Sequence, residues 1–161
     1  MKKVISIFAL LFPLLAGCGF VPMYSESHVL KAELADIYIA PIAGTNGIDL
    51  RNHLILNWNT SNIEGAKYTL HVDLREPQTF LKGLQRTGDA TWEEVRVTAT
   101  WRLSRDGETV AQSTETAAES YTFVADLVAA AASRANATRN AIRVIGNRIT
   151  MKVNAKLKSS Y

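Results

Sequence analysis

Few side chains in this sequence are of a type that could carry out covalent or acid–base chemistry. They are a single cysteine, Cys18, and three histidines, His28, His53 and His71. The histidines are scattered along the chain and fit no metal-ligand spacing. Ser120 precedes an expected helix and is better explained as its N-cap than as a nucleophile. We therefore expect surface histidines, no metal or cofactor, and no enzymatic activity.

The chemistry open to Cys18 follows from the residues before it. Two lysines follow Met1, residues 4–15 are almost wholly apolar, and Ala16 and Gly17 are small. This order is that of a signal peptide, and the apolar run is shorter than the ~20 residues of a membrane-spanning helix. Leu15-Ala16-Gly17-Cys18 resembles the bacterial lipobox, whose cysteine becomes the first mature residue and carries lipid on its sulfur and amino group. More than one acyl chain, such as palmitate, makes a durable membrane anchor.

Three segments follow from this interpretation. Residues 1–17 are a signal peptide, residues 18–30 a lipidated tether, and residues 31–161 one folded domain, a size that suits a single core. Gly19 stands where many bacterial lipoproteins of the inner membrane have aspartate. Lipoproteins without that aspartate resemble those sorted to the outer membrane. We therefore expect an outer-membrane anchor with the domain on the periplasmic side.

Charge is distributed unevenly along the chain. The whole sequence has a formal net charge of +3, and removal of the signal peptide takes away Lys2 and Lys3. The nearly neutral remainder and the export signal exclude a nucleic-acid-binding protein. From residue 127 onward there are seven basic residues and no acidic one. Their positions are Arg134, Arg139, Arg143, Arg148, Lys152, Lys156 and Lys158.

Alternating apolar residues predict four strands. They cover residues 36–39, 68–75, 95–103 and 108–118, and Ser104-Arg105-Asp106-Gly107 predicts a hairpin turn between the last two. The third strand directs Val95, Val97, Ala99, Trp101 and Leu103 to one face. Residues 77–88 are expected to form a polar link.

Two segments have helical periodicity. In residues 48–58, Leu50, Leu54 and Trp58 recur every four residues. From about residue 122 to 157, one apolar stripe continues to the end of a long helix that we expect to be packed along most of its length. Its members are Val124, Leu127, Val128, Ala131, Ala135, Thr138, Ile142, Ile145, Ile149 and Val153. Gly146 lies inside this helix and marks a candidate bend.

The element order β-α-β-β-β-α predicts an α+β fold. A right-handed crossover makes the first two strands parallel, and a meander completes a mixed four-stranded sheet. Both helices can cover one face, giving a two-layer sandwich whose other sheet face is open.

Several short motifs are similar to those of the LPS-assembly lipoprotein family, LptE, particularly its alphaproteobacterial branch. They are Cys18-Gly19-Phe20 with Pro22 and Tyr24, Leu50-Arg51-Asn52-His53-Leu54, Arg86-Thr87 and Ser120-Tyr121. The resemblance implies an outer-membrane lipoprotein that sits in the lumen of the LPS-assembly β-barrel. It also implies that the protein plugs and helps to assemble this barrel and touches LPS during insertion into the outer leaflet.

The open sheet face is the candidate LPS site. Lys82 and Arg86 in the expected link, with Arg96 and Arg102 on the strand, could bind the phosphates of the lipid A headgroup, since guanidinium groups match phosphate bidentately. The alternative is a solvated face whose cations pair with Asp73 or Glu94. A different function also remains open, in which a lipid-anchored periplasmic adaptor binds a soluble protein through the basic C-terminal helix.

Overall fold

The structure is a computed structural model that describes residues 32–84, 90–122 and 126–159. Cys18, Arg86, His28 and Val124 lie outside these ranges. Residues 32–35 form a helical turn ahead of the first strand. The elements that follow are β1 (Ile37–Ile39), α3 (Gly44–Trp58), β2 (Tyr68–Leu74), β3 (Gln78–Leu84), β4 (Ala90–Arg105), β5 (Glu108–Thr122) and α4 (Leu127–Lys158).

The sheet is built around β4. One edge of β4 pairs with β5 along almost its whole length, and the other edge pairs first with β3 and then with β2. β2 and β3 therefore follow one another along the same edge, separated by residues 75–77. Pro77 has no N–H to donate to the ladder, which accounts for the interruption at this point. β1 is parallel to β2, as the predicted crossover requires.

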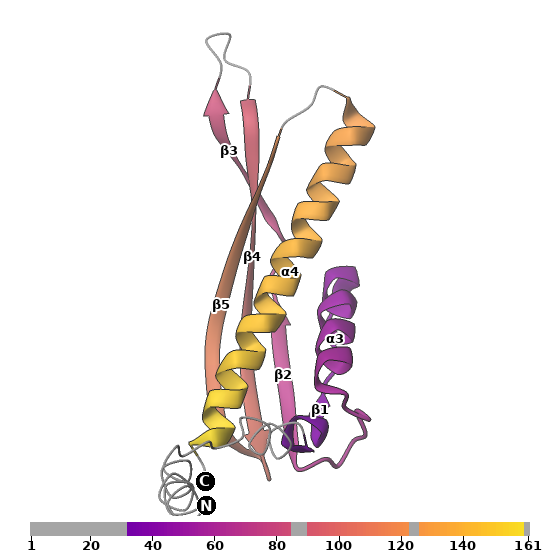
Figure 1. Ribbon diagram of the computed structural model, residues 1–161, viewed down its shortest axis with the longest axis vertical. Coiled ribbons are helices and arrows are strands. Elements are labelled where there is room, and N and C mark those ends of the chain that lie inside the picture. Colours follow the sequence, from indigo (N-terminus) through magenta and orange to yellow (C-terminus); the bar gives the residue numbers. More distant parts are fainter. Residues whose placement is uncertain (1–31, 85–89, 123–125, 160–161) are drawn as a thin grey trace, which may run out of the picture.

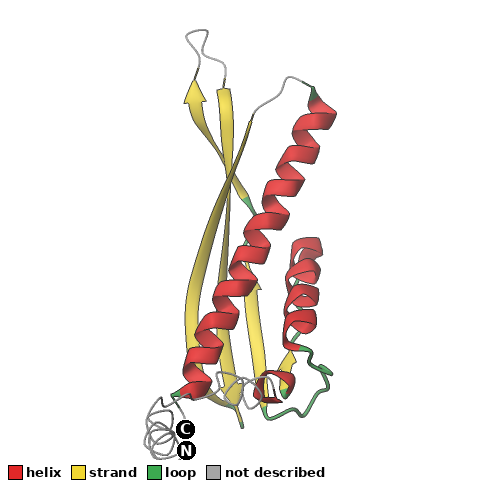
Figure 2. Ribbon diagram, in the orientation of Figure 1, coloured by secondary structure: helices red, strands yellow, loops and turns green. Residues whose placement is uncertain are grey.

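The molecule is elongated and has two layers (Figure 1). β4 has 16 residues and α4 has 32, so each extends for about 50 Å at the usual rise of a strand and of a helix. Both helices cover the same face of the sheet (Figure 2). α4 packs diagonally over β4 and β5, and α3 lies beside α4. The predicted α+β sandwich with one open sheet face is confirmed.

Local sequence explains where the elements end. Asp106 and Gly107 both have positive φ and form the β4–β5 hairpin turn. Asn59 ends α3 in the left-handed region. Asp126 caps α4, because its carboxylate accepts a hydrogen bond of 2.8 Å from the backbone N–H of Ala129.

The core lies between the sheet and the two helices. The predicted register of β4 is confirmed, since its odd-numbered residues from Val95 to Leu103 are buried while Arg102 is exposed. The helical contribution comes from positions that share one face. They are Leu50, Leu54 and Trp58 of α3 and Ala141, Ile142, Ile145, Ile149, Val153 and Leu157 of α4.

The sheet has five strands, and the prediction of four was wrong. Residues 77–88 were expected to be a link, but residues 78–84 form β3, which pairs with the first half of β4. β4 begins before its alternating stretch. On the edge of β4 where β2 pairs with the C-terminal half, the N-terminal half also needs a partner, and β3 provides it. The weak alternation of β3 reflects its position at the sheet edge, where none of its described side chains is fully buried.

The start of α4 also differs from the prediction. The helix begins at Leu127, and Ser120 lies in β5, so Ser120 is not the N-cap. The buried stripe begins only at Ala137, while Leu127 is 86% exposed and Val128 80% exposed. The reason is geometric: the first turns of α4 diverge from the sheet (Figure 1), so no element lies beneath that part of the stripe.

Candidate functional site

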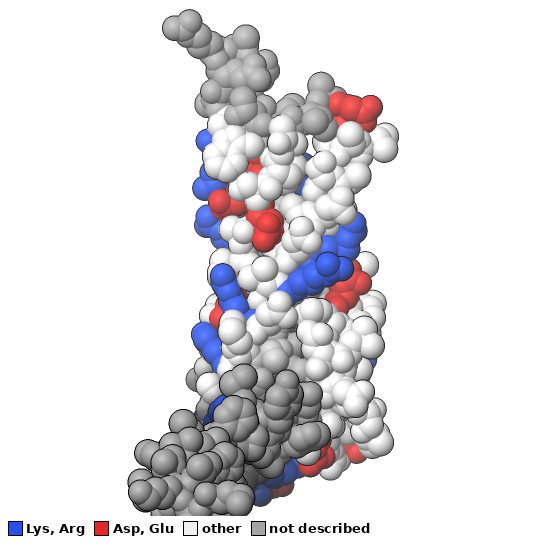
Figure 3. All heavy atoms as spheres, in the orientation of Figure 1, with Lys and Arg blue, Asp and Glu red and all other residues white. Residues whose placement is uncertain are grey.

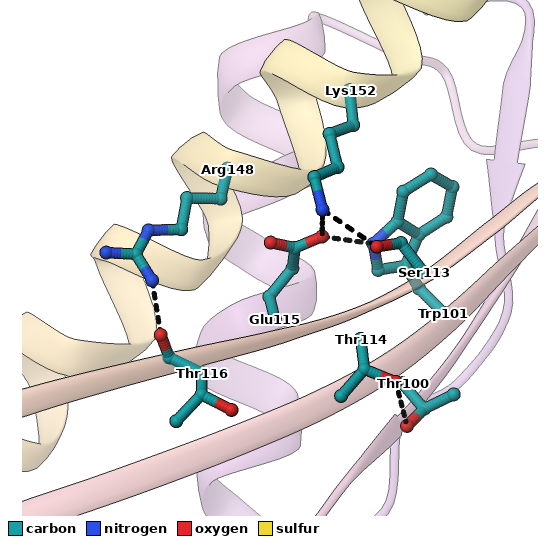
Figure 4. A network of polar contacts seen from close by, with 8 residues as sticks. All are labelled: Thr100, Trp101, Ser113, Thr114, Glu115, Thr116, Arg148 and Lys152. Atoms are coloured by element: carbon teal, nitrogen blue, oxygen red, sulfur yellow. Dashed lines mark hydrogen bonds and ion pairs between the residues drawn. The ribbon is translucent and has the colours of Figure 1, made fainter.

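The uncovered sheet face is polar across β4 and β5. Two threonine pairs bridge the strands, with Oγ1 atoms 3.2 Å apart between Thr98 and Thr116 and 3.1 Å apart between Thr100 and Thr114. Figure 4 shows the second pair. These hydroxyls satisfy one another across the ladder. The face can therefore meet water or a polar partner without rearrangement.

Lys82 and Arg96, two of the candidate LPS-binding residues, share one carboxylate. Glu94 accepts from Arg96 at 2.8 Å, and Lys82 Nζ lies 3.5 Å from its other oxygen. The Arg96 guanidinium also stacks over the Phe80 ring, 4.8 Å from its centroid. The pairing with Glu94 that the sequence left open is therefore present. Three charged groups in contact have a net charge of +1, and a phosphate would compete with Glu94 for both cations.

Arg102 is in a different situation. It lies on β4 between His71 of β2 and Gln112 of β5. It is exposed and makes no hydrogen bond or ion pair with another residue of the described ranges. An open depression of about 470 Å³ adjoins it, lined in part by Asp73 and Thr100. Arg102 is thus the candidate whose guanidinium can reach a ligand without first leaving a partner.

Arg86 and Cys18 cannot be placed beside these residues, because both lie outside the described ranges. Their roles stay predictions. The structure brings Lys82 of β3 and Arg96 of β4 together at the Glu94 carboxylate. Arg102 lies further along β4.

The C-terminal part of α4 holds the helix onto the sheet through its cations. Lys152 Nζ lies 2.7 Å from Glu115 and 2.8 Å from Ser113 Oγ, and the guanidinium of Arg148 donates to the backbone carbonyl of Thr116 (Figure 4). The Trp101 indole N–H donates to the same Glu115 carboxylate at 3.2 Å. Two residues of the basic helix therefore bind the domain itself.

Glu115 is a buried carboxylate whose surroundings keep it ionised. Burial by itself raises its pKa, but hydrogen bonds from Lys152, Trp101 and Ser113 outweigh that effect, so the pKa of Glu115 is lowered. Sequence reasoning missed this residue. Its strand alternates weakly, and only its position opposite the buried Ala99 in the β4–β5 register indicated the covered face.

A second buried carboxylate, that of Glu93, lies under α4 nearer the start of the helix. Tyr121 donates to the buried Glu93, and Arg134 both donates to the Tyr121 hydroxyl at 3.1 Å and lies 3.6 Å from Glu93. Burial is the main reason that the pKa of Tyr121 is raised, and Glu93 adds to it while Arg134 opposes it. Tyr121 thus serves as a structural link between β5, β4 and α4.

The two described histidines lie in different parts of the molecule. His71 is exposed on the open face. His53 lies between the helices, where its Nε2 is 2.9 Å from Nδ2 of Asn57 and 3.2 Å from Oδ1 of Asn147. Within the described ranges, no three His, Cys, Asp or Glu side chains come together as a metal site. No helix in that part of the chain has the length and hydropathy needed to cross a bilayer.

Comparison with known proteins places this architecture among bacterial lipoproteins. No family model and no curated protein matches the chain. Its fold is similar to that of a Caulobacter crescentus protein designated a lipoprotein, with a TM-score of 0.66 and 23% identity over 82% of this chain and 97% of the other.

Two further solved structures agree. Rare lipoprotein B from Shewanella oneidensis has a TM-score of 0.61 at 12% identity, over 77% of this chain and 96% of that protein. A minor lipoprotein from Acinetobacter baumannii has a TM-score of 0.57 at 22% identity, over 75% and 92%. Identities this low establish the fold and not the activity. The chain therefore has the fold found in a group of bacterial lipoproteins that includes rare lipoprotein B.

Proposed function

We propose that this protein is an outer-membrane lipoprotein, anchored on the periplasmic side through lipid on Cys18. In this proposal it plugs the lumen of the LPS-assembly β-barrel and assists LPS binding and insertion. Its role is then binding and assembly rather than catalysis. The observation that carries the proposal is the fold, shared with rare lipoprotein B, in a chain whose N-terminal residues resemble a lipobox.

The polar sheet face supports this role. The lumen of an outer-membrane barrel is polar, so a domain inside it must present satisfied polar groups. The threonine pairs meet that requirement, and Arg102 is exposed on the same face of β4 for a ligand. We assign LPS contact to Arg102, Arg96 and Lys82 on this face, together with Arg86.

Co-purification tests the complex. The full chain, carrying a C-terminal tag, is expressed in a Gram-negative host and extracted in mild detergent. We expect a large outer-membrane barrel to elute with it in stoichiometric amount. Recovery of a soluble periplasmic protein instead would support the adaptor function and contradict the proposed function as a barrel plug.

A titration with LPS tests the face. Charge reversal of Arg96 and Arg102 together, or of Lys82 and Arg86 together, should weaken LPS binding while the free energy of unfolding changes by less than about 1 kcal/mol. Binding should also weaken as salt rises, because exposed cations are screened. Arg105→Glu is the matched control, since Arg105 is an exposed cation that pairs with Asp106 at the hairpin turn and is not assigned to the LPS contact. Equal losses for the control and the pairs would count against a specific face.

A further inference from the structure

The basic residues of α4 divide between two sides of the helix. Arg134, Arg148 and Lys152 reach the sheet, as described above. Arg139 and Arg143 instead line a groove of about 270 Å³ between α4 and α3. We call this the helix groove. Its residues are Asp49, Asn52, His53 and Leu56 of α3 and Arg139, Ile142 and Arg143 of α4.

Charged atoms are spread over the side of the molecule that Figure 3 shows. Lys and Arg atoms lie at mid-height with Asp or Glu atoms beside them, and further charged atoms of both signs lie along the left edge of the view and higher up. What distinguishes Arg139 and Arg143 is therefore their lack of an ion pair among the described residues.

The charges of the helix groove are not neutralised within the described part of the chain. Arg143 makes no hydrogen bond or ion pair there, and Arg139 donates only to Asn136, one turn earlier on the same helix. Like charges four residues apart on a helix repel each other. Asp49 lines the same groove, yet forms no ion pair with either arginine. The domain therefore keeps two guanidinium groups available at a cost to its own helix.

The frame of the groove is fixed by close helix packing. A Cβ added to Gly146 would lie 2.5 Å from Cδ2 of His53, so the absence of a side chain at Gly146 lets the helices approach closely. His53 also contacts Asn57 and Asn147. Because this contact sets the spacing of the helices, it fixes the backbone positions from which the two arginines project.

The chemistry of the groove favours a carboxylate from a protein partner. Arg139, Arg143 and Asp49 together have a net charge of +1, which one carboxylate neutralises, whereas a phosphate dianion would leave the groove with an excess negative charge. Leu56, 79% exposed at the groove, offers an apolar contact, and Asn52 can pair with backbone groups. Arginine with exposed apolar side chains is the composition of protein interfaces.

We propose that the helix groove docks acidic side chains from the wall of the barrel partner. This inference rests on the proposed function, because it names the surface that meets the barrel. The helix groove lies between α3 and α4, which cover the opposite face of the sheet, so the open sheet face remains free for LPS.

The test uses the full lipid-anchored chain co-expressed with the LPS-assembly barrel, in three forms: wild type, Arg139→Glu with Arg143→Glu, and the control pair Arg75→Glu with Arg105→Glu, two exposed cations that belong to neither proposed contact. We expect the groove pair to reduce the co-purified barrel about 10-fold or more, as loss of interface arginines does. The control pair should retain the barrel. Arg143→Lys should reduce the co-purified barrel less than Arg143→Glu does, since lysine keeps the positive charge but lacks the paired N–H donors of a guanidinium group. Thermal melts of all forms must coincide within a few degrees.

Three results would overturn the inference in distinguishable ways. If wild type retains the barrel and the groove pair retains it equally, the groove is not the contact, and the proposed function stands. If the groove pair retains the barrel but loses binding to purified LPS, the groove is a phosphate site instead. If wild type itself brings down no barrel, the proposed function fails and the groove proposal fails with it.

Discussion

Lys152 Nζ on α4 lies 2.7 Å from the carboxylate of Glu115 on β5. The Lys152 side chain is half exposed, whereas the Glu115 side chain is only 6% exposed. Trp101 from the central strand donates to the same carboxylate. One contact therefore joins the long helix, the edge strand and the core of β4, and it explains why the C-terminal half of α4 stays on the sheet.

Lys152→Met should destabilise the domain by about 1 to 3 kcal/mol, because it leaves a buried carboxylate without its charged donor. Urea melts of residues 19–161, which we expect to fold on their own, provide the measurement. Arg143→Met is the matched control on the same helix, and it should change the free energy of unfolding by no more than about 0.5 kcal/mol. A null effect of Lys152→Met would mean that solvent replaces the ammonium group.

Stability should depend on pH through Glu115. Its pKa is lowered in the folded state, so the unfolded chain binds the proton more readily. The contribution of Glu115 is therefore present above the ordinary glutamate pKa of 4.5 and is lost as the pH falls through the lower folded value. Melts of wild type and Glu115→Gln between pH 7 and pH 3 should show a stability difference that shrinks on acidification. A constant difference would contradict the assignment.

Gly146→Ala should cost about 1 to 3 kcal/mol, since the added methyl group meets the His53 ring in a packed helix crossing. The double variant with His53→Ala should recover part of the loss, which a double-mutant cycle measures. Asn140→Ala, at an exposed position of the same helix, is the control for helix propensity. Stabilisation by Gly146→Ala, as expected of an unpacked helical glycine, would show that the crossing is looser.

Truncation of the two tryptophans on β4 should destabilise the domain to very different extents. Trp101 is buried on the covered face, and Trp101→Ala should cost about 3 to 5 kcal/mol. Trp92 is 45% exposed, and Trp92→Ala should cost less than about 1 kcal/mol in the isolated domain. Chemical denaturation followed by far-UV circular dichroism measures both. A loss below about 1 kcal/mol for Trp101 would reverse the strand register.

Cys18→Ser should leave the precursor unprocessed or the protein unanchored, because a hydroxyl cannot accept the thioether lipid. Gel mobility and membrane fractionation of the full chain report both outcomes. Ser27→Cys with Cys18→Ser, which moves the thiol away from the small residues, should not restore anchoring. Normal maturation of Cys18→Ser would remove the lipoprotein interpretation.

How much the sequence predicted depended on how sharply each segment alternates. Residues 68–74 and 95–103 alternate clearly because one face is buried and the other is open, and both were predicted in register. β3 was missed because its apolar residues Phe80 and Leu81 are adjacent rather than alternating, and at the sheet edge both stay exposed. Glu115 was missed because a buried carboxylate beneath a lysine looks, in the sequence, like any solvated acid on a weakly alternating strand.

By itself the sequence determined four of the five strands, the segments of α3 and α4, the covered face of β4, the hairpin at Asp106-Gly107 and the candidate lipobox, since each follows from neighbouring residues. Only the tertiary structure decided how the cations are used. Arg134 and Lys152 pair with buried acids, Arg96 shares Glu94 with Lys82, and Arg139 and Arg143 face a groove. The spacing in the sequence predicts on which side of its helix or strand each cation lies. It does not predict the partner of that cation, because the partner belongs to another element and comes within reach only when the elements pack together.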